Sequence, residues 1–381
     1  MHAVAADTVF DGTRIHSGCA VLIEGADIVG LVARAETQAG VPVRNMPSGA
    51  WLAPGFIDVQ VNGGGDVLFN DSPNPQAIAT IAAAHRRFGT TGFLPTLISD
   101  NAATMRAASD AADAAAAVLP GVLGVHFEGP FVSPERAGVH DRAMLRQPTP
   151  NDLALLTQPR RGVTLATVAP ECLPVGFIEH LVAAGIRVSL GHSMATYDET
   201  RAAIDAGMTG FTHLFNAMRP MTAREPGPIA AALEDTRAFY GLIVDGVHVA
   251  PAMLRLALRS AGRAMLVTDA MPPVGGLQPH FRLAGKAVEA HDGRCATADG
   301  TLAGSVLDMA SAVRNCIGLL GLDLPQALTL ASATPADFLG LGHRLGRLAP
   351  GYRADMVAFE PADIGVLATW VAGEDDSDRA Q

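Results

Sequence analysis

The sequence predicts an α/β protein: a (β/α)8 TIM-like barrel with a small β-sandwich domain built from both chain ends. Between residues 54 and 345, short apolar runs alternate with Ala-rich segments of helical character, which is typical of a parallel sheet. Eight such runs favour a closed barrel. The alternative, an open doubly wound sheet, lacks the G-x-G-x-x-G motif that commonly follows its first strand.

Both chain ends predict short strands rather than helices. Apolar runs at 8–12 and 19–25 close in Asp-Gly or Glu-Gly turns, and helical periodicity is absent. The segment 345–359 returns to the same character. We therefore expect the two ends to fold together, with the barrel inserted between them. The expected boundaries are 1–53 and 346–381 for the β domain with a C-terminal tail, and 54–345 for the barrel.

The barrel elements follow in order from the alternation. The expected strands are 56–61, 92–97, 121–127, 163–168, 186–190, 209–215, 239–244 and 264–268. The expected helices between them are 76–88, 101–118, 174–184, 196–206 and 251–261. Residues 275–304 are rich in glycine and predict a hairpin-like insertion, which is either a lid or an ordinary surface excursion. Further helices are expected around 305–320 and 325–339.

Composition excludes several classes of protein. Hydrophobic residues make up 49% and charged residues 17% of the 381 residues, which is enough for a sizeable core. The net charge is -11 and no Lys/Arg-rich run occurs, so nucleic-acid binding is disfavoured. The four scattered cysteines predict isolated thiols. The N-terminus does not resemble a signal peptide and no apolar segment could span a bilayer, so a cytoplasmic location without membrane contact is expected.

Polar residues stand at the end of nearly every expected strand, where the active sites of such barrels gather. Glu128, His192 and His213 form a plausible set of three metal ligands. Two imidazoles and a carboxylate suit Zn2+ and leave a fourth position open, and they would also accept Fe2+ or Co2+. Each residue alone has a structural explanation, such as a hydrogen-bonded core histidine. Their joint occurrence favours a metal site.

Three further residues have chemistry that fits such a site. Asp269 ends the last expected strand after an apolar run, and next to a metal site it could accept a proton and later deliver it to a leaving group. A buried aspartate that receives backbone N–H bonds is the structural alternative. Arg224 and His248 are the best candidates for binding an anion, and a solvated surface arginine is the alternative for Arg224.

Sequence motifs run from the first expected strand to the last. They are PGFIDVQVNG at 54–63, HFEGP at 126–130, GHS at 191–193, HLFNAM at 213–218, DGVH at 245–248, TDAM at 268–271 and LGRLAPGYRAD at 345–355. Together and in this order they resemble the amidohydrolase superfamily and, within it, the N-acetylglucosamine-6-phosphate deacetylase family. The resemblance covers most of the chain. It implies hydrolysis of N-acetyl-D-glucosamine 6-phosphate to D-glucosamine 6-phosphate and acetate, in amino-sugar catabolism and cell-wall recycling.

The resemblance also implies residue roles. Glu128, His192 and His213 would hold one catalytic divalent metal per subunit, most simply Zn2+. Asp269 would act as general base on the attacking water and then as general acid on the departing amine, while His140 helps to polarise the acetyl carbonyl. The implied substrate contacts are His140, Asn216, Ala217, Arg224, His248, Leu302, Ala303, Gly304 and Ser305.

Two expectations concern the metal count and the assembly. Many superfamily members have His-x-His on the first strand, where this chain has Gln60 and Asn62; amides are poor zinc ligands beside imidazole, so any second metal site there is weak or missing. His248 is implied to reach the phosphate of a neighbouring subunit's substrate, which predicts a homodimer. An amidohydrolase acting on another amide or N-acylated amino sugar, and a catalytically silent binding barrel, remain alternatives.

Overall fold

The computed structural model of the chain describes residues 1–37 and 39–375, so the end of the predicted C-terminal tail, residues 376–381, lies outside the described residues. The chain divides into two compact units. The first contains residues 1–58, 85–93 and the segment from 308 onward, and the second contains residues 59–84 and 94–307. Within the described part of the chain, no helix is long and apolar enough to cross a membrane.

The first unit is built on one seven-stranded sheet. Its strands are β1 (His2–Phe10), β2 (Ile15–Glu24), β3 (Asp27–Ala33), β4 (Val43–Asn45), β5 (Trp51–Pro54), β20 (Met356–Glu360) and β21 (Gly365–Trp370). Alternate residues of β1 serve different cores: Val4 and Ala6 pack in one cluster, and Ala3 and Ala5 in another. β20 pairs antiparallel with β5, so both chain ends share this sheet. A separate β-sandwich domain and the boundaries drawn from sequence stay predictions.

Helices α8 (Met309–Leu320), α9 (Leu324–Ala331) and α10 (Ala333–Leu339) complete the first unit. The predicted helix at 325–339 is in fact two helices. The break is at Ser332, whose backbone leaves helical geometry at φ -134° and ψ -71°. Its hydroxyl donates to the Leu328 carbonyl, a local bond that competes with helix continuation.

The eight predicted barrel strands are all present. They are β6 (Phe56–Val61), β9 (Thr90–Ile98), β10 (Gly124–Glu128), β11 (Val163–Val168), β12 (Arg187–Leu190), β13 (Gly210–Phe211), β14 (Phe239–Leu242) and β15 (Arg263–Leu266). They form one sheet in sequence order, and every residue of β6, β9 and β10 is buried, as expected for a parallel sheet covered on both faces. A parallel bridge between Val61 and Ala270 joins the last strand's extension to the first, so the barrel is nearly closed.

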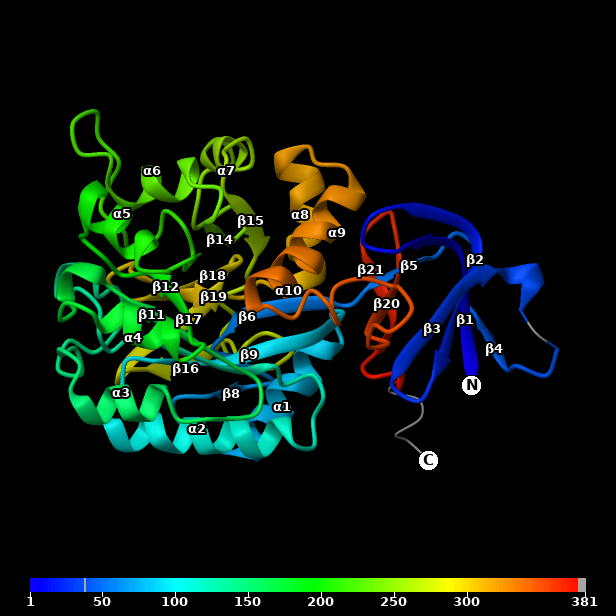
Figure 1. Cartoon of the computed structure of the whole chain (residues 1–381), viewed down its shortest axis with the longest axis horizontal. Coiled ribbons are helices and arrows are strands. Elements are labelled where there is room, and N and C mark those ends of the chain that lie inside the picture. Colours follow the sequence, from blue (N-terminus) through cyan, green and yellow to red (C-terminus); the bar gives the residue numbers. More distant parts are fainter. Residues whose placement is uncertain (38, 376–381) are drawn as a thin grey trace. The chain divides into compact units, whose positions relative to one another are not determined.

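Helices surround these strands, with α2 and α5 to α7 on opposite sides in Figure 1. The bounds are α1 (Pro75–Arg86), α2 (Ala102–Ala116), α3 (Pro150–Leu156), α4 (Phe177–Ala183), α5 (Tyr197–Asp205), α6 (Gly227–Glu234) and α7 (Pro251–Ala257). α3 and α6, of seven and eight residues, were not predicted from the sequence. Short 3-10 helices cover Arg34–Glu36, Pro134–Arg136 and Pro170–Cys172.

The insertion forms a four-stranded antiparallel sheet, larger than the predicted hairpin. Its strands are β16 (His280–Leu283), β17 (Lys286–His291), β18 (Arg294–Thr297) and β19 (Leu302–Ser305), and a small hairpin of β7 (Gly63–Gly64) and β8 (Val67–Leu68) precedes α1. Asp66 accepts the backbone N–H groups of Leu277 and Gln278 at the start of the insertion. At its end, the Ser305 N–H donates to the Asp269 carbonyl. Both ends are thus bonded to the barrel, and a lid motion stays a prediction.

Candidate active site

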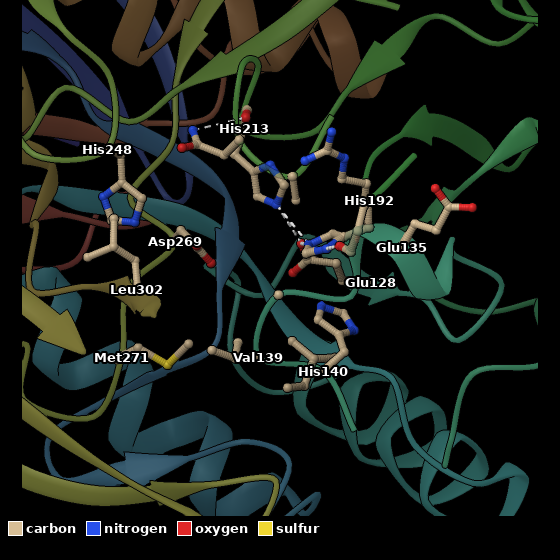
Figure 2. A pocket seen from close by; sticks show the side chains of 16 residues that line it. Glu128, Glu135, Val139, His140, His192, His213, His248, Asp269, Met271 and Leu302 are labelled. Carbon is tan, nitrogen blue, oxygen red and sulfur yellow. Dashed lines mark hydrogen bonds and ion pairs between the residues drawn. The ribbon is translucent and has the colours of Figure 1, made fainter. Parts of the chain in front are cut away.

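The predicted site residues gather at one cavity of the second unit, with a volume of about 280 Å³. Ten of the predicted residues line it: Glu128, His140, His192, His213, Asn216, Ala217, His248, Asp269, Leu302 and Gly304. They come from the carboxyl ends of the barrel strands and from the insertion, which is where the barrel architecture places a site. Figure 2 shows Asp269 between His248 and Glu128, with His140 below Glu128 in this view.

Three donor atoms converge on one point in the cavity. Glu128 is the last residue of β10, and His192 and His213 each follow their strand by two residues. The Nε2 atoms of His192 and His213 lie 3.1 and 2.9 Å from Glu128 Oε1, and 3.1 Å from each other. Glu128, His140 and His192 also offer ligand atoms within 4.8 Å of one another. This cluster could hold a metal ion.

The bonding of the histidines fits that interpretation. His192 Nδ1 lies 2.7 Å from the Arg136 carbonyl oxygen. A carbonyl accepts only, so Nδ1 of His192 carries a proton, and Nε2 is the ring nitrogen that faces Glu128 and would be the one offered to a cation. Two imidazoles and a carboxylate aimed at one point are the donor set that a divalent transition metal prefers. The residues present therefore fit a cation of this class.

Electrostatics separates the two buried carboxyl groups of the cavity. Burial would raise the pKa of Glu128, but hydrogen bonds and charge from His192 and His213 hold it well below its usual range. Burial and the nearby Glu128 charge instead raise the pKa of Asp269 to about 6. Burial lowers the pKa of His213, but Glu128, Asp269 and a backbone hydrogen bond together raise it, so the net change is upward. Glu128 is thus kept ionised, whereas Asp269 can exchange a proton near neutral pH.

Asp269 is bonded by side chains at the C-terminal end of strand β6 and just after it. Its Oδ1 accepts hydrogen bonds from Gln60 Nε2 at 3.1 Å and from Asn62 Nδ2 at 2.6 Å. Its backbone N–H donates to the Gln60 carbonyl at 3.0 Å. No described residue bonds its Oδ2. Gln60 and Asn62, predicted as a weak second metal site, thus present their amide nitrogens to carboxylates.

Two further buried histidines are distinguished by their partners. His126 is bonded at both nitrogens by hydroxyls, from Thr96 at 3.1 Å and Thr167 at 2.7 Å, and burial lowers its pKa to about 4. It is a neutral core residue. His140 contacts the Ser99 hydroxyl at 2.6 Å, and the Ser99 backbone N–H donates to the same Nδ1. Burial and His192 lower the pKa of His140 to about 3, so it is neutral and carries its proton on Nε2.

Four non-glycine residues that line the cavity have left-handed backbone geometry. The φ angles of His192, His213, Ala217 and Asp269 are 48°, 34°, 50° and 53°. Such geometry costs a non-glycine residue about 1 kcal/mol or more, and it persists where the surroundings fix it. Backbone bonds do so here: the His192 carbonyl accepts from the Ser133 N–H, and the Asp269 carbonyl accepts from the Ser305 N–H.

The remaining predicted contacts are placed differently. Asn216 bonds the His213 carbonyl through Nδ2, and the Ala217 carbonyl accepts from the Ser193 N–H, so both lie on the turn after His213. His248 is bonded to Asp245 and lines the cavity of its own chain. Arg224 is exposed and does not line the cavity. Ala303 packs in the insertion core, and the Ser305 hydroxyl bonds the Thr268 carbonyl.

Some lining residues escaped the sequence analysis. They are Ile98, Glu135, Arg136, Gly138, Val139 and Met271. Glu135, Arg136, Gly138 and Val139 belong to the loop between HFEGP and His140, so the closeness of these two motifs in sequence was the available signal. Arg136 is the one arginine or lysine among the lining residues, and its Nε contacts Met194 Sδ at 3.0 Å.

Comparison with known proteins agrees with the barrel and its site. The model of the amidohydrolase family matches residues 51–379. The chain therefore belongs to the amidohydrolase family.

Within that family it is similar to deacetylases of amino-sugar phosphates. It is 43% identical over 361 residues to the N-acetylgalactosamine-6-phosphate deacetylase of Shewanella sp. (strain ANA-3), covering 93% of this chain and 91% of the relative. It is 33% identical to the N-acetylglucosamine-6-phosphate deacetylase of Haemophilus influenzae, covering 93% and 94%.

Solved structures of similar proteins share the whole fold. The N-acetylglucosamine-6-phosphate deacetylase from Pasteurella multocida aligns with a TM-score of 0.95 at 32% identity, covering 98% of this chain and 99% of that one. A variant of the Mycobacterium smegmatis N-acetyl-D-glucosamine-6-phosphate deacetylase, in complex with N-acetyl-D-glucosamine-6-phosphate, aligns with a TM-score of 0.88 at 36% identity, covering 98% of each chain.

Proposed function

We propose that this protein hydrolyses N-acetyl-D-glucosamine 6-phosphate to D-glucosamine 6-phosphate and acetate, as a metal-dependent amidohydrolase of amino-sugar catabolism. The observation that carries the proposal is the meeting of Glu128, His192 and His213 within 3.1 Å, in the same cavity as the proton-exchanging carboxyl of Asp269. The similarity to proteins named for this reaction, at 33 to 38% identity, supplies the substrate.

Glu128, His192 and His213 would hold one divalent cation per subunit, most simply Zn2+, with Fe2+ or Co2+ as alternatives. His213 is preferred over His140 as the third ligand because its Nε2 touches both other donors, whereas Nδ1 of His140 is engaged by Ser99. When bound, the cation would polarise the acetyl carbonyl and make the attacking water more acidic.

The protein's own groups then move the proton. The water oxygen adds to the acetyl carbon, and Asp269 takes a proton from that water. The proton goes to Oδ2 of Asp269, the carboxylate oxygen that Gln60 and Asn62 do not bond. Nε2–H of His140 can donate to the carbonyl oxygen as negative charge develops there, because Nδ1 is an acceptor from Ser99. Asp269 returns the proton to the amide nitrogen, the C–N bond breaks, and acetate and the free amine leave.

The sugar phosphate requires donors beyond this centre. Asn216 and Ala217 lie on the turn after His213, and His248 lines the same cavity. The exposed Arg224 would contribute to phosphate binding, and a homodimer, in which His248 reaches the neighbouring substrate, stays part of the proposal. Leu302 and Gly304 border the cavity and would contact the acetyl group and sugar. A cytoplasmic location fits this chemistry.

The test is acetate release by purified protein of known metal content. Activity on N-acetylglucosamine 6-phosphate, little on the unphosphorylated sugar, and about one metal per chain are expected. Metal without this activity would move the search to other amides or N-acylated amino sugars. Neither metal nor activity after addition of zinc would refute the ligand assignment and favour a silent barrel.

A second candidate substrate is N-acetylgalactosamine 6-phosphate, the epimer at C4. It is favoured by the 43 and 37% identity to two proteins named for that reaction. Both epimers present the same acetamide and phosphate, so the site described serves either chemistry. The ratio of kcat/KM for the two epimers decides between them, and sedimentation of the protein tests the dimer.

A further inference from the structure

Two amide side chains hold the carboxylate that moves the proton. Gln60 lies on β6 and Asn62 is the first residue after that strand, and both side chains are at least 98% buried. Gln60 Nε2 is 3.2 Å from Glu128 Oε2 and 3.1 Å from Asp269 Oδ1, so it bridges the two carboxyl groups. Asn62 Nδ2 is 2.6 Å from the same Asp269 oxygen.

The orientation of these amides follows from their neighbours. Ionised carboxylates only accept hydrogen bonds, so the NH2 ends of both amides must face them, and a flipped amide would set oxygen against oxygen. Asn62 Oδ1 is buried and has no hydrogen-bond partner among the described residues. Leaving an acceptor unpaired is costly, which indicates that the bond from Asn62 to Asp269 outweighs this loss.

The same strand fixes the main chain of Asp269. The Asp269 N–H donates to the Gln60 carbonyl, and the Asn62 N–H donates to the Ala270 carbonyl, both at 3.0 Å. With Oδ1 bonded twice and the backbone fixed, the carboxylate has one open oxygen, Oδ2. An amide N–H cannot ligate a cation, so in this arrangement the pair is a hydrogen-bond donor rather than a second metal site.

We propose that Gln60 and Asn62 are positioning residues that lock the Asp269 carboxylate so that its Oδ2 alone exchanges the proton. Gln60 additionally ties Asp269 to Glu128, so it fixes the separation between the proton carrier and the metal-binding cluster. This inference deepens the proposed function and rests on it. It assigns to the first-strand amides a role that needs no second cation.

The test compares Asn62→Leu and Gln60→Leu with Gln158→Leu, a control on the exposed surface. Losing one hydrogen bond to the charged group should lower kcat about 10- to 100-fold, with KM changed less than about threefold and metal content and melting temperature retained. In an Asp269→Asn background, the Asn62→Leu change should lower kcat less than about twofold further, because the two residues act as a unit. The proposal would be overturned if the leucine variants had the wild-type kcat, or if only their KM changed. It would also be overturned if Asn62→Leu lowered kcat as much in the Asp269→Asn background as it does in the wild type.

Two additions keep the test decisive. If a leucine variant does not fold, Asn62→Asp and Gln60→Glu retain the shape while removing the N–H donor, and the same kcat losses are expected. Crystal structures of wild type and variants give a readout independent of turnover. A rotated Asp269 carboxylate in the variants supports the positioning role even if the wild type hydrolyses neither sugar phosphate. An unmoved carboxylate in a variant whose kcat is lowered refutes it.

Discussion

Replacing Asp269 with asparagine should abolish proton transfer while leaving the scaffold intact. Asparagine has the same shape, and its Oδ1 can still accept from Gln60 and Asn62. General acid–base catalysis contributes about 10²- to 10⁴-fold, so kcat should fall by that factor. The proposed metal ligands Glu128 and His192 are untouched, so metal content should stay unchanged.

The same substitution should stabilise the metal-free protein at high pH. The pKa of Asp269 rises from 3.8 to about 6 on folding. At about 1.4 kcal/mol for each pH unit, the ionised carboxylate costs about 3 kcal/mol in the folded state. Because the folded state binds the proton more tightly, wild-type stability is lost as pH rises from about 4 through about 6. The neutral asparagine side chain has no charge to bury, so the variant should gain about 3 kcal/mol at pH 8 and about half of that at pH 5.

The measurement is urea unfolding of chelator-treated wild type and variant at both pH values, beside the kinetics of the metal-loaded forms. Asp110→Asn, an exposed position on α2, is the matched control and should change neither quantity. A stability gain independent of pH would refute the electrostatic reasoning. A variant that retains wild-type kcat would remove Asp269 from the mechanism.

Three further outcomes are expected. Gly304→Ala should destabilise the protein by more than about 1 kcal/mol beyond the effect of Gly300→Ala. Both glycines have positive φ, but of the two only a Cβ at 304 would meet backbone, at 2.7 Å from the Asp269 carbonyl oxygen. Equal effects of the two substitutions in melting experiments would contradict this. Wild-type kcat/KM should rise with pH and reach half of its plateau at or below about pH 6. Asp269 must be ionised to act as a base, and a bound cation would lower the pKa of Asp269 below the value of about 6. A half-maximal pH well above 6 would exclude Asp269 as the base. The His192→Gln variant should lose its bound metal, whereas the His126→Gln variant should keep it, as measured by elemental analysis. Hydroxyl groups already occupy both ring nitrogens of His126. The reverse result would change the proposed set of ligands.

The barrel could be predicted because its signal is local. Each strand buries both faces and therefore appears as a short apolar run, as the fully buried β10 does. The insertion was underestimated because its strands alternate in exposure, as in β17, and its turns need only two residues. The broken helix at Ser332 was missed because a single hydroxyl bond to the preceding turn leaves little trace in hydrophobic periodicity.

The part of the candidate site that lies at the carboxyl ends of the barrel strands could be predicted from the sequence. Glu128, His192 and His213 could be identified as candidates because polar residues recur at the carboxyl ends of several buried strands, although each one alone has a structural explanation. Arg136 could not, since the direction of a loop side chain is set by tertiary contacts such as that with Met194. The amide orientation of Gln60 depends on Asp269, which is 209 residues away in sequence.

The two carboxyl groups of the cavity have the same chemistry, but their surroundings shift their pKa values in opposite directions. Glu128 and Asp269 are both buried, and burial raises the pKa of each. The imidazoles of His192 and His213 reverse that rise for Glu128, whereas the Glu128 charge adds to it for Asp269. The ionised state of Glu128 therefore supports the proposed role of Asp269 as a proton carrier, because a neutral group at 128 would remove one of the two causes that raise the Asp269 pKa. The proposed metal-binding cluster and the proposed proton carrier are thus coupled through charge, and the bridge through Gln60 couples them through geometry as well.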